Sequence, residues 1–250
     1  MNKGIFITFE GGEGAGKSTH IRFLSEVLTE QGHTVLCLRE PGGTTLGEEL
    51  RDIVLDPKNE DMVDEAELLI YEAARAQIVN KVINPALEAG SVVLCDRFYD
   101  STMAYQAYGR GLDRAFVEQA NQFATDGLVP DRTILLTCGH AQAGLERATQ
   151  HIAADRLESA GEDFHARVNK GFMDIAENDP ERVRVVESGD LKSMTAAAIF
   201  AELSDIFTWM SDDRVVNEEL FERLDIRYYG NKHKESSDEL PLSENDAEGE

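Results

Sequence analysis

The sequence predicts an α/β fold, in which a doubly wound, five-stranded parallel sheet is covered by helices on both faces. Three observations carry this prediction. Short β-branched runs alternate with longer helix-like stretches, the runs are apolar almost throughout, and 250 residues suffice for one such domain. A strand buried on both faces has no solvent side, so continuous apolar runs favour a parallel sheet.

The strands and helices of this fold can be assigned to particular stretches of the chain. Five apolar runs fit strands, at residues 5–10, 34–40, 91–96, 132–138 and 182–187. Six longer stretches fit helices, at residues 18–31, 64–89, 114–125, 142–151, 162–176 and 194–210. Strand and helix therefore alternate in the way that crossover connections of a parallel sheet require.

The composition of the chain changes after residue 212. Residues 231–250, NKHKESSDELPLSENDAEGE, are polar and acidic and contain few core-forming side chains, which predicts disorder. Residues 215–230 keep several apolar positions and allow a short helix. We therefore expect one folded domain over residues 1–212 and a largely disordered acidic extension over residues 213–250.

Charge and cysteine usage restrict the possible partners and the compartment. The formal net charge of −24 at pH 7 would repel a nucleic-acid backbone or an anionic membrane surface, so neither is an expected partner. No apolar run reaches the about 18 residues of a membrane-spanning helix. The three cysteines, Cys37, Cys95 and Cys138, lie in strand-like runs, which indicates reduced thiols and a cytoplasmic protein.

The stretch FEGGEGAGKST, residues 9–19, follows the first predicted strand and precedes the first predicted helix. Gly11, Gly16, Lys17 and Ser18 fit the P-loop pattern in that context. Glycines allow backbone N–H groups to surround phosphates, the lysine reaches the β- and γ-phosphates, and the serine hydroxyl binds Mg²⁺. The stretch predicts a nucleoside triphosphate site, although ATPases, GTPases and small-molecule kinases all use such a loop.

The stretch CDRFYDSTMAYQ, residues 95–106, places Asp96 at the end of the third predicted strand. A carboxylate at that edge of the sheet can hold Mg²⁺ or orient the attacking group. A local ion pair between Asp96 and Arg97 is the alternative interpretation. The stretch LREPGGT, residues 38–44, brings Glu40 and a rigid turn to the same edge, where it forms either a site wall or a simple loop.

Tyr71 and Arg75 share one face of the predicted helix over residues 64–89. An aromatic ring one turn from a guanidinium can hold a base between them and donate to its carbonyl edge. The alternative is a core-facing tyrosine beside an arginine whose stem covers apolar surface.

Together these stretches resemble the bacterial thymidylate kinase family, nucleoside monophosphate kinases that make dTDP from dTMP and ATP. The resemblance rests on FEGGEGAGKST, REPGGT, YEAAR, DRFYDSTMAYQ followed by GRG, and DRLE at residues 155–158. It spans about residues 3–212, and it implies a P-loop nucleoside monophosphate kinase domain over residues 1–212. It also implies dTMP phosphorylation in dTTP synthesis, with ATP as donor, Mg²⁺ as cofactor and a homodimer.

The resemblance further implies roles for individual residues. The ATP-binding residues are Gly11, Gly12, Glu13, Gly14, Ala15, Gly16, Lys17, Ser18 and Thr19. The dTMP-binding residues are Glu13, Glu40, Arg51, Tyr71, Arg75, Arg97, Thr102, Tyr105 and Gln106. Among these, Tyr71 would stack on thymine and Tyr105 would crowd the 2′ position. The metal would be held by Ser18 and Asp96, and the catalytic residues are Lys17, Asp96, Arg97, Arg147 and Arg156.

The lid, about residues 142–163, departs from the family pattern. It offers Arg147 and Arg156, but has Thr149 and His151 where relatives often carry arginine, so the arginine that meets the transferred phosphoryl is left open.

The sequence leaves two alternatives to dTMP phosphorylation open. One is a P-loop kinase with another acceptor, such as dUMP. The other is a catalytically weakened nucleotide-binding protein that acts through its acidic tail.

Overall fold

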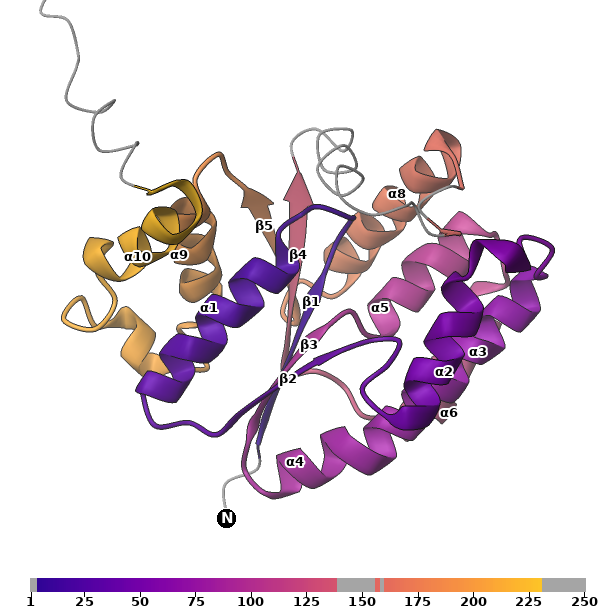
Figure 1. Cartoon of the computed structure of the whole chain (residues 1–250), viewed down its shortest axis with the longest axis horizontal. Helices are drawn as coiled ribbons and strands as arrows, with labels where there is room; N and C mark the ends of the chain where they lie inside the picture. Colours follow the sequence, from indigo (N-terminus) through magenta and orange to yellow (C-terminus); the bar gives the residue numbers. More distant parts are fainter. Residues whose placement is uncertain (1–3, 139–155, 158–159, 231–250) are drawn as a thin grey trace, which may run out of the picture.

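The computed structural model of the protein describes residues 4–138, 156–157 and 160–230 (Figure 1). Its sheet contains five parallel strands in the order β2-β3-β1-β4-β5. Each strand lies within one residue of its predicted bounds, and the predicted fold class is confirmed. The strands are β1 (Ile5–Glu10), β2 (Val35–Arg39), β3 (Val92–Asp96), β4 (Arg132–Cys138) and β5 (Val183–Ser188).

Helices cover both faces of this sheet (Figure 1). One face carries α1 (Lys17–Glu30), α9 (Lys192–Leu203) and α10 (Glu218–Tyr229). The other carries α2 (Thr45–Leu55), α3 (Asp64–Ile78), α4 (Asn84–Glu88), α5 (Tyr99–Thr102), α6 (Arg114–Thr125) and α8 (Glu162–Asn178). Shorter helical turns are η1 (Pro57–Asn59), η2 (Val79–Ile83), η3 (Met103–Gly109) and η4 (Thr208–Ser211).

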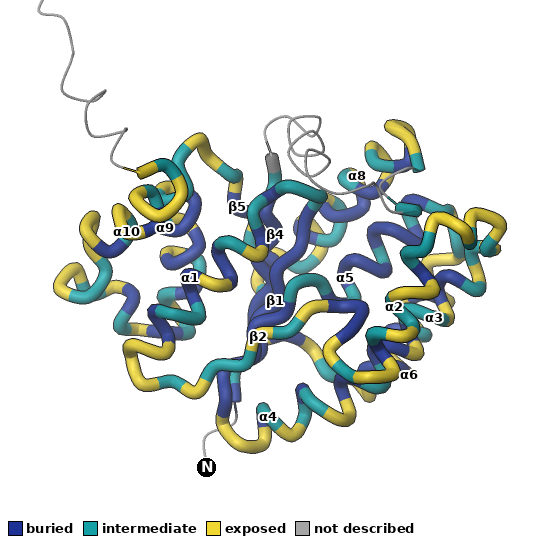
Figure 2. The backbone as a smooth tube through the Cα atoms, viewed as in Figure 1, coloured by how far each residue is buried: buried dark blue, intermediate teal, exposed yellow. Residues whose placement is uncertain are grey.

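The two faces of the sheet belong to different parts of the hydrophobic core. Ile7 and Phe9 of β1 pack into the cluster beneath α1 and α9, whereas Phe6 packs with η2 and α4 on the opposite face. Every residue of β1 after Ile5 is consequently buried, as the dark tube in Figure 2 shows. The edge strand β2 is only partly covered. Burial on both faces explains why the inner strands β1, β3 and β4 read as nearly continuous apolar runs.

The helices differ from the sequence prediction in several places. The helix predicted over residues 194–210 corresponds to α9, which ends at Leu203, and to the separate turn η4. The single helix predicted over residues 64–89 is interrupted by η2, a π-helical turn between α3 and α4. Helix α2 and the α5–η3 segment were not predicted. Thr44 starts α2, because its side chain accepts a hydrogen bond from the Gly47 N–H at 2.9 Å. The helix predicted over residues 142–151 lies outside the described residues.

The packed part of the chain continues beyond the predicted domain end at residue 212. Helix α10, in the segment where a short helix was allowed, buries Leu220 and Leu224 in the same cluster as α1 and α9. Two ion pairs join it to α1, Arg223 with Glu30 at 2.7 Å and Arg227 with Glu26 at 2.8 Å. Residues 231–250 lie outside the described residues. In the described ranges, none of the helices combines the length and hydropathy needed to span a bilayer.

Candidate active site

The glycine-rich loop of residues 11–16 connects β1 to α1. Gly11, Gly14 and Gly16 have positive φ angles of 122°, 70° and 91°, which L side chains rarely adopt. At Gly11 space is limiting as well, since an added Cβ would lie 2.1 Å from the carbonyl oxygen of Leu136 in β4. The loop therefore needs glycine both for its conformation and for its close contact with the neighbouring strand.

Lys17 and Ser18 are placed by the first turn of α1. Lys17 is 7% exposed, and its Nζ donates to the carbonyl oxygens of Gly11 and Gly12, each at 3.0 Å. Burial lowers the pKa of Lys17 from its usual value. The Ser18 hydroxyl donates to Oδ2 of Asp96 at the end of β3, at 2.9 Å. The loop, the lysine and the strand-end carboxylate thus meet at one edge of the sheet.

The pair of Ser18 and Asp96 suits Mg²⁺. In the described ranges, no cluster of three or more His, Cys, Asp or Glu side chains could hold a metal ion. Magnesium in nucleotide enzymes needs no such cage, because one or two protein oxygens act together with phosphates and water. A hydroxyl and a carboxylate 2.9 Å apart beside a phosphate-binding loop provide those oxygens.

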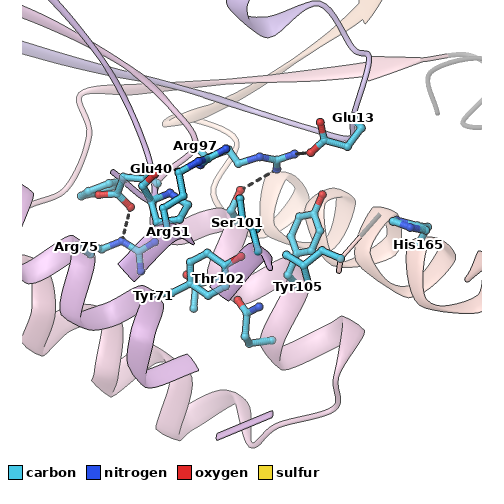
Figure 3. Close-up of a pocket in the computed structure, with 15 residues that line it drawn as sticks. Glu13, Glu40, Arg51, Tyr71, Arg75, Arg97, Ser101, Thr102, Tyr105 and His165 are labelled. Atoms are coloured by element: carbon cyan, nitrogen blue, oxygen red, sulfur yellow. Dashed lines mark hydrogen bonds and ion pairs between the residues drawn. The ribbon is translucent and has the colours of Figure 1, made fainter. Parts of the chain in front are cut away.

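Arg97 connects this edge to a neighbouring pocket. Its backbone lies in the left-handed region, with φ 69°. The guanidinium pairs with Glu13 of the loop and donates to the Ser101 hydroxyl at 3.2 Å (Figure 3). It also lies over the ring of Tyr105, 5.2 Å from the ring centre. Arg97 lowers the pKa of the Glu13 carboxyl to about 2, so this carboxylate is ionised at neutral pH.

A buried carboxylate fixes the segment that carries Arg97. Glu10, at the end of β1, accepts hydrogen bonds from the N–H of Phe98 at 2.8 Å and from the Ser101 hydroxyl at 2.6 Å. Burial, together with the nearby Asp100, raises the pKa of Glu10 to about 7. Sequence reasoning gave Glu10 no role, although it lies inside the loop motif.

One pocket gathers every residue predicted to bind dTMP. Figure 3 shows Tyr71, Thr102 and Tyr105 around a common space, with Arg97 on the side of the loop. The predicted residues that line it are Glu13, Glu40, Arg51, Tyr71, Arg75, Arg97, Thr102, Tyr105 and Gln106. Six lining residues were not predicted, namely Pro41, Leu55, Phe98, Ser101, Leu157 and His165.

Arg75 is held at the wall of this pocket by two carboxylates. Its Nε donates to Glu40 at 2.8 Å, and its Nη1 donates to Glu72 at 2.8 Å and to Asn121 at 3.0 Å. The ring of Phe98 lies beneath it, 5.5 Å from the guanidinium carbon. Burial raises the pKa of Glu40 to about 7 despite the adjacent arginine. Arg75 is therefore fixed in position as well as charged.

Of the two predicted lid arginines, the structure describes Arg156. Arg156 pairs with Glu67 of α3 and donates to the carbonyl oxygen of Val54 in α2 at 3.1 Å. It does not line the pocket that contains Arg97. Arg147 lies outside the described residues.

Comparison with known proteins identifies the family. A family model described as thymidylate kinase matches residues 9–199. The thymidylate kinase of Geotalea uraniireducens is 48% identical over 204 residues, which cover 79% of this chain and 95% of that protein. The thymidylate kinase of Desulfovibrio desulfuricans is 49% identical over 191 residues, which cover 74% and 88%. This chain belongs to the thymidylate kinase family.

A solved structure supports the assignment at the level of the fold. The crystal structure of the thymidylate kinase from Ehrlichia chaffeensis matches 81% of this chain and 99% of its own, with a TM-score of 0.66 and 33% identity. The predicted family is therefore confirmed. Thymidylate kinases are transferases that use ATP and dTMP. The roles of individual residues stay predictions.

Proposed function

We propose that this protein transfers the γ-phosphoryl group of ATP to dTMP and so forms dTDP for dTTP synthesis. One observation carries the proposal: all nine residues predicted to bind dTMP line a single pocket, and this pocket reaches the phosphate-binding loop through Glu13 and Arg97. Neither alternative function is favoured by a comparable observation.

The pocket offers different chemistry to the two ends of a nucleotide. At the base end, Tyr71 provides an aromatic surface, while Arg75, Thr102 and Gln106 provide polar groups. At the phosphate end, Arg51 and Arg97 provide positive charge. The ionised Glu13 accepts a hydrogen bond from the deoxyribose 3′-hydroxyl in this proposal, and the ring of Tyr105 takes the space of a 2′-hydroxyl.

The phosphoryl transfer requires alignment and positive charge more than a covalent intermediate. Lys17 binds the phosphates of ATP, and Arg97 holds the acceptor phosphate next to them. Mg²⁺, when bound by Ser18 and Asp96, supplies charge that neutralises the phosphate oxygens. Arg147 and Arg156 remain the predicted lid arginines.

Several expectations stay predictions. They are Mg²⁺ as the ion, the homodimer, the cytoplasmic location, and the absence of nucleic-acid and membrane partners. The net charge of −24 supports the last of these.

The experiment that tests the proposed function is the measurement of ADP formation from ATP and Mg²⁺ with dTMP, dUMP, UMP and dCMP in separate reactions. We expect rapid turnover with dTMP and little with the other acceptors, and loss of turnover in Lys17→Ala. ATP binding without turnover of any acceptor would contradict the proposal and would favour the weakened nucleotide-binding protein. A higher rate with dUMP than with dTMP would favour the other acceptor.

A further inference from the structure

A buried carboxylate lies behind the base end of the pocket. Glu67 of α3 is fully buried, with 0% exposure. Its Oε1 accepts hydrogen bonds from the Gln106 amide nitrogen at 2.8 Å and from Arg110 Nε at 3.2 Å. Its Oε2 accepts from Arg110 Nη2 at 3.0 Å and pairs with Arg156. Three side chains, each at least 39 residues from Glu67 in the sequence, thus converge on one carboxylate.

The two arginines keep Glu67 ionised, which fixes the direction of its hydrogen bond with Gln106. A carboxylate between two guanidinium groups stays ionised, so Glu67 only accepts hydrogen bonds. Either guanidinium suffices for this, since Arg110 contacts both carboxylate oxygens and Arg156 contacts Oε2. Gln106 must therefore turn its NH₂ group toward Glu67, because the opposite orientation would place two oxygens against each other.

The amide oxygen of Gln106 is consequently the end left for a ligand. Gln106 is 1% exposed and lines the pocket. Over the described ranges, no protein group donates a hydrogen bond to its Oε1. The same holds for the second guanidinium nitrogen of Arg75, Nη2, which has no acceptor among the described side chains and backbone groups. The pocket thus presents one acceptor from Gln106 and one donor from Arg75.

This pair matches the edge of thymine and opposes that of cytosine. Thymine offers a carbonyl oxygen at C4 and an N–H donor at N3. Cytosine offers an amino group at C4 and an unprotonated acceptor at N3. In the same place, the C4 amino group of cytosine would face the N–H donor of Arg75. Its N3 acceptor would face the amide oxygen of Gln106. Buried polar groups left unpaired in this way give strong rejection of the wrong substrate.

We propose that Glu67 is a positioning residue, which locks the amide of Gln106 so that the pocket selects a base with an N3–H donor over cytosine. The proposal rests on the proposed function and adds a residue outside the pocket to its specificity. Glu67 does not line the pocket and so contacts no substrate. It acts through Gln106 alone.

The test is the ratio of kcat/KM for dTMP to kcat/KM for dCMP in Glu67→Gln. A glutamine at this position can donate as well as accept. The Gln106 amide can then flip, so that its NH₂ group faces the pocket and donates to N3 of cytosine. We expect the ratio to fall at least about tenfold. A charge-balanced variant, Glu67→Gln with Arg110→Gln, should show the same fall, since the new glutamine can still donate to Gln106 while the net charge of the parent protein is kept.

Two control variants separate this effect from general loosening. Asp64→Asn removes a partly exposed carboxylate that lies 3.4 Å from Arg110 and does not contact Gln106. Arg110→Gln leaves Glu67 and its contact with Gln106 in place. Both should keep the ratio of the parent protein. A fall of similar size in either control would overturn the proposal.

The remaining outcomes are equally decisive. An unchanged ratio in both Glu67 variants would overturn the proposal, and so would failure of both to fold, since the role of Glu67 would then be structural. If the parent protein does not phosphorylate dTMP, the proposed function fails. The ratio of the Kd values for dTMP and dCMP, measured by calorimetry in the parent and in Glu67→Gln, then still tests whether Glu67 orients Gln106. If it phosphorylates dTMP and Glu67→Gln keeps the discrimination, only this inference fails.

Discussion

Replacing Glu40 by glutamine is expected to stabilise the protein progressively, relative to the parent chain, as the pH rises from 5 to 8. Glu40 is buried beside Arg75, its Oε2 accepts a hydrogen bond from Arg75, and its Oε1 has no partner among the described residues. Burial raises the pKa of Glu40 from 4.5 to about 7 in the folded protein. A folded-state pKa above the unfolded value means that stability is lost as the pH rises toward 7.

The size of the effect follows from these two pKa values. Between pH 5 and pH 8 the unfolded carboxyl is largely ionised, whereas the folded one ionises only near pH 7. A shift of this size makes the parent protein lose about 2–3 kcal/mol of unfolding free energy over that interval through Glu40. Glutamine does not titrate, so Glu40→Gln escapes the loss. The loss through Glu10, whose pKa is also raised, occurs in both proteins and cancels in the difference.

Urea unfolding at pH 5, 6, 7 and 8 measures this difference directly. Glu40→Gln carries a constant cost at every pH from its altered contact with Arg75, so only the change with pH is interpreted. The control is Glu49→Gln, which removes one exposed negative charge from the same segment. A difference between Glu40→Gln and the parent that stays constant from pH 5 to pH 8 would refute the reasoning. It would mean that Arg75 fully offsets the burial of Glu40.

Three further changes test the loop and the metal site. Lys17→Ala is expected to lower kcat by about 10²–10³ with little change in thermal stability, which steady-state kinetics and thermal unfolding would measure. Ser18→Ala should raise the Mg²⁺ concentration for half-maximal rate by about tenfold, and an unchanged Mg²⁺ titration would count against this ligand. Gly11→Ala should lower the unfolding free energy by about 3 kcal/mol or more, because strain at positive φ adds to the contact with Leu136. Gly32→Ala is its control, since φ is also positive there but nothing lies within 4 Å, and it should cost about 1–2 kcal/mol.

Periodicity and turn residues predicted most of the fold but missed some helices. The inner strands were found because burial on both faces leaves an almost uninterrupted apolar run, and the edge strands β2 and β5 because they are rich in valine and leucine. Helix α2 was missed because its first turn contains Gly47, a poor helix former that is needed there because an added Cβ would lie 2.6 Å from the carbonyl oxygen of Gly42. Pro85, which has no N–H for a helical hydrogen bond, was the available signal that the predicted helix is interrupted, and α3 and α4 were predicted as one helix because it was not used.

The site could be predicted only where a motif carried it. Lys17, Arg97 and the pocket residues lie in recognisable stretches near strand ends. Glu67 could not be found, because a charged residue on a helix is usually exposed and its partners are distant in sequence. Gln106 is 39 residues away and Arg156 is 89 residues away. Glu10 is a different case, since it was visible inside the motif and only its burial reveals its role.

The packing of α10 shows that the packed unit ends later in the chain than the match to the family model. The match to the family model ends at residue 199, and composition placed the end of the folded unit at residue 212. The cooperative unit extends further, because Phe221 of α10 stacks edge-on against Phe200 and also contacts Phe23. A shortened protein that ends at Asp212 would leave those two rings uncovered and prone to association. One that ends at Gly230 would keep the α1–α9–α10 cluster intact.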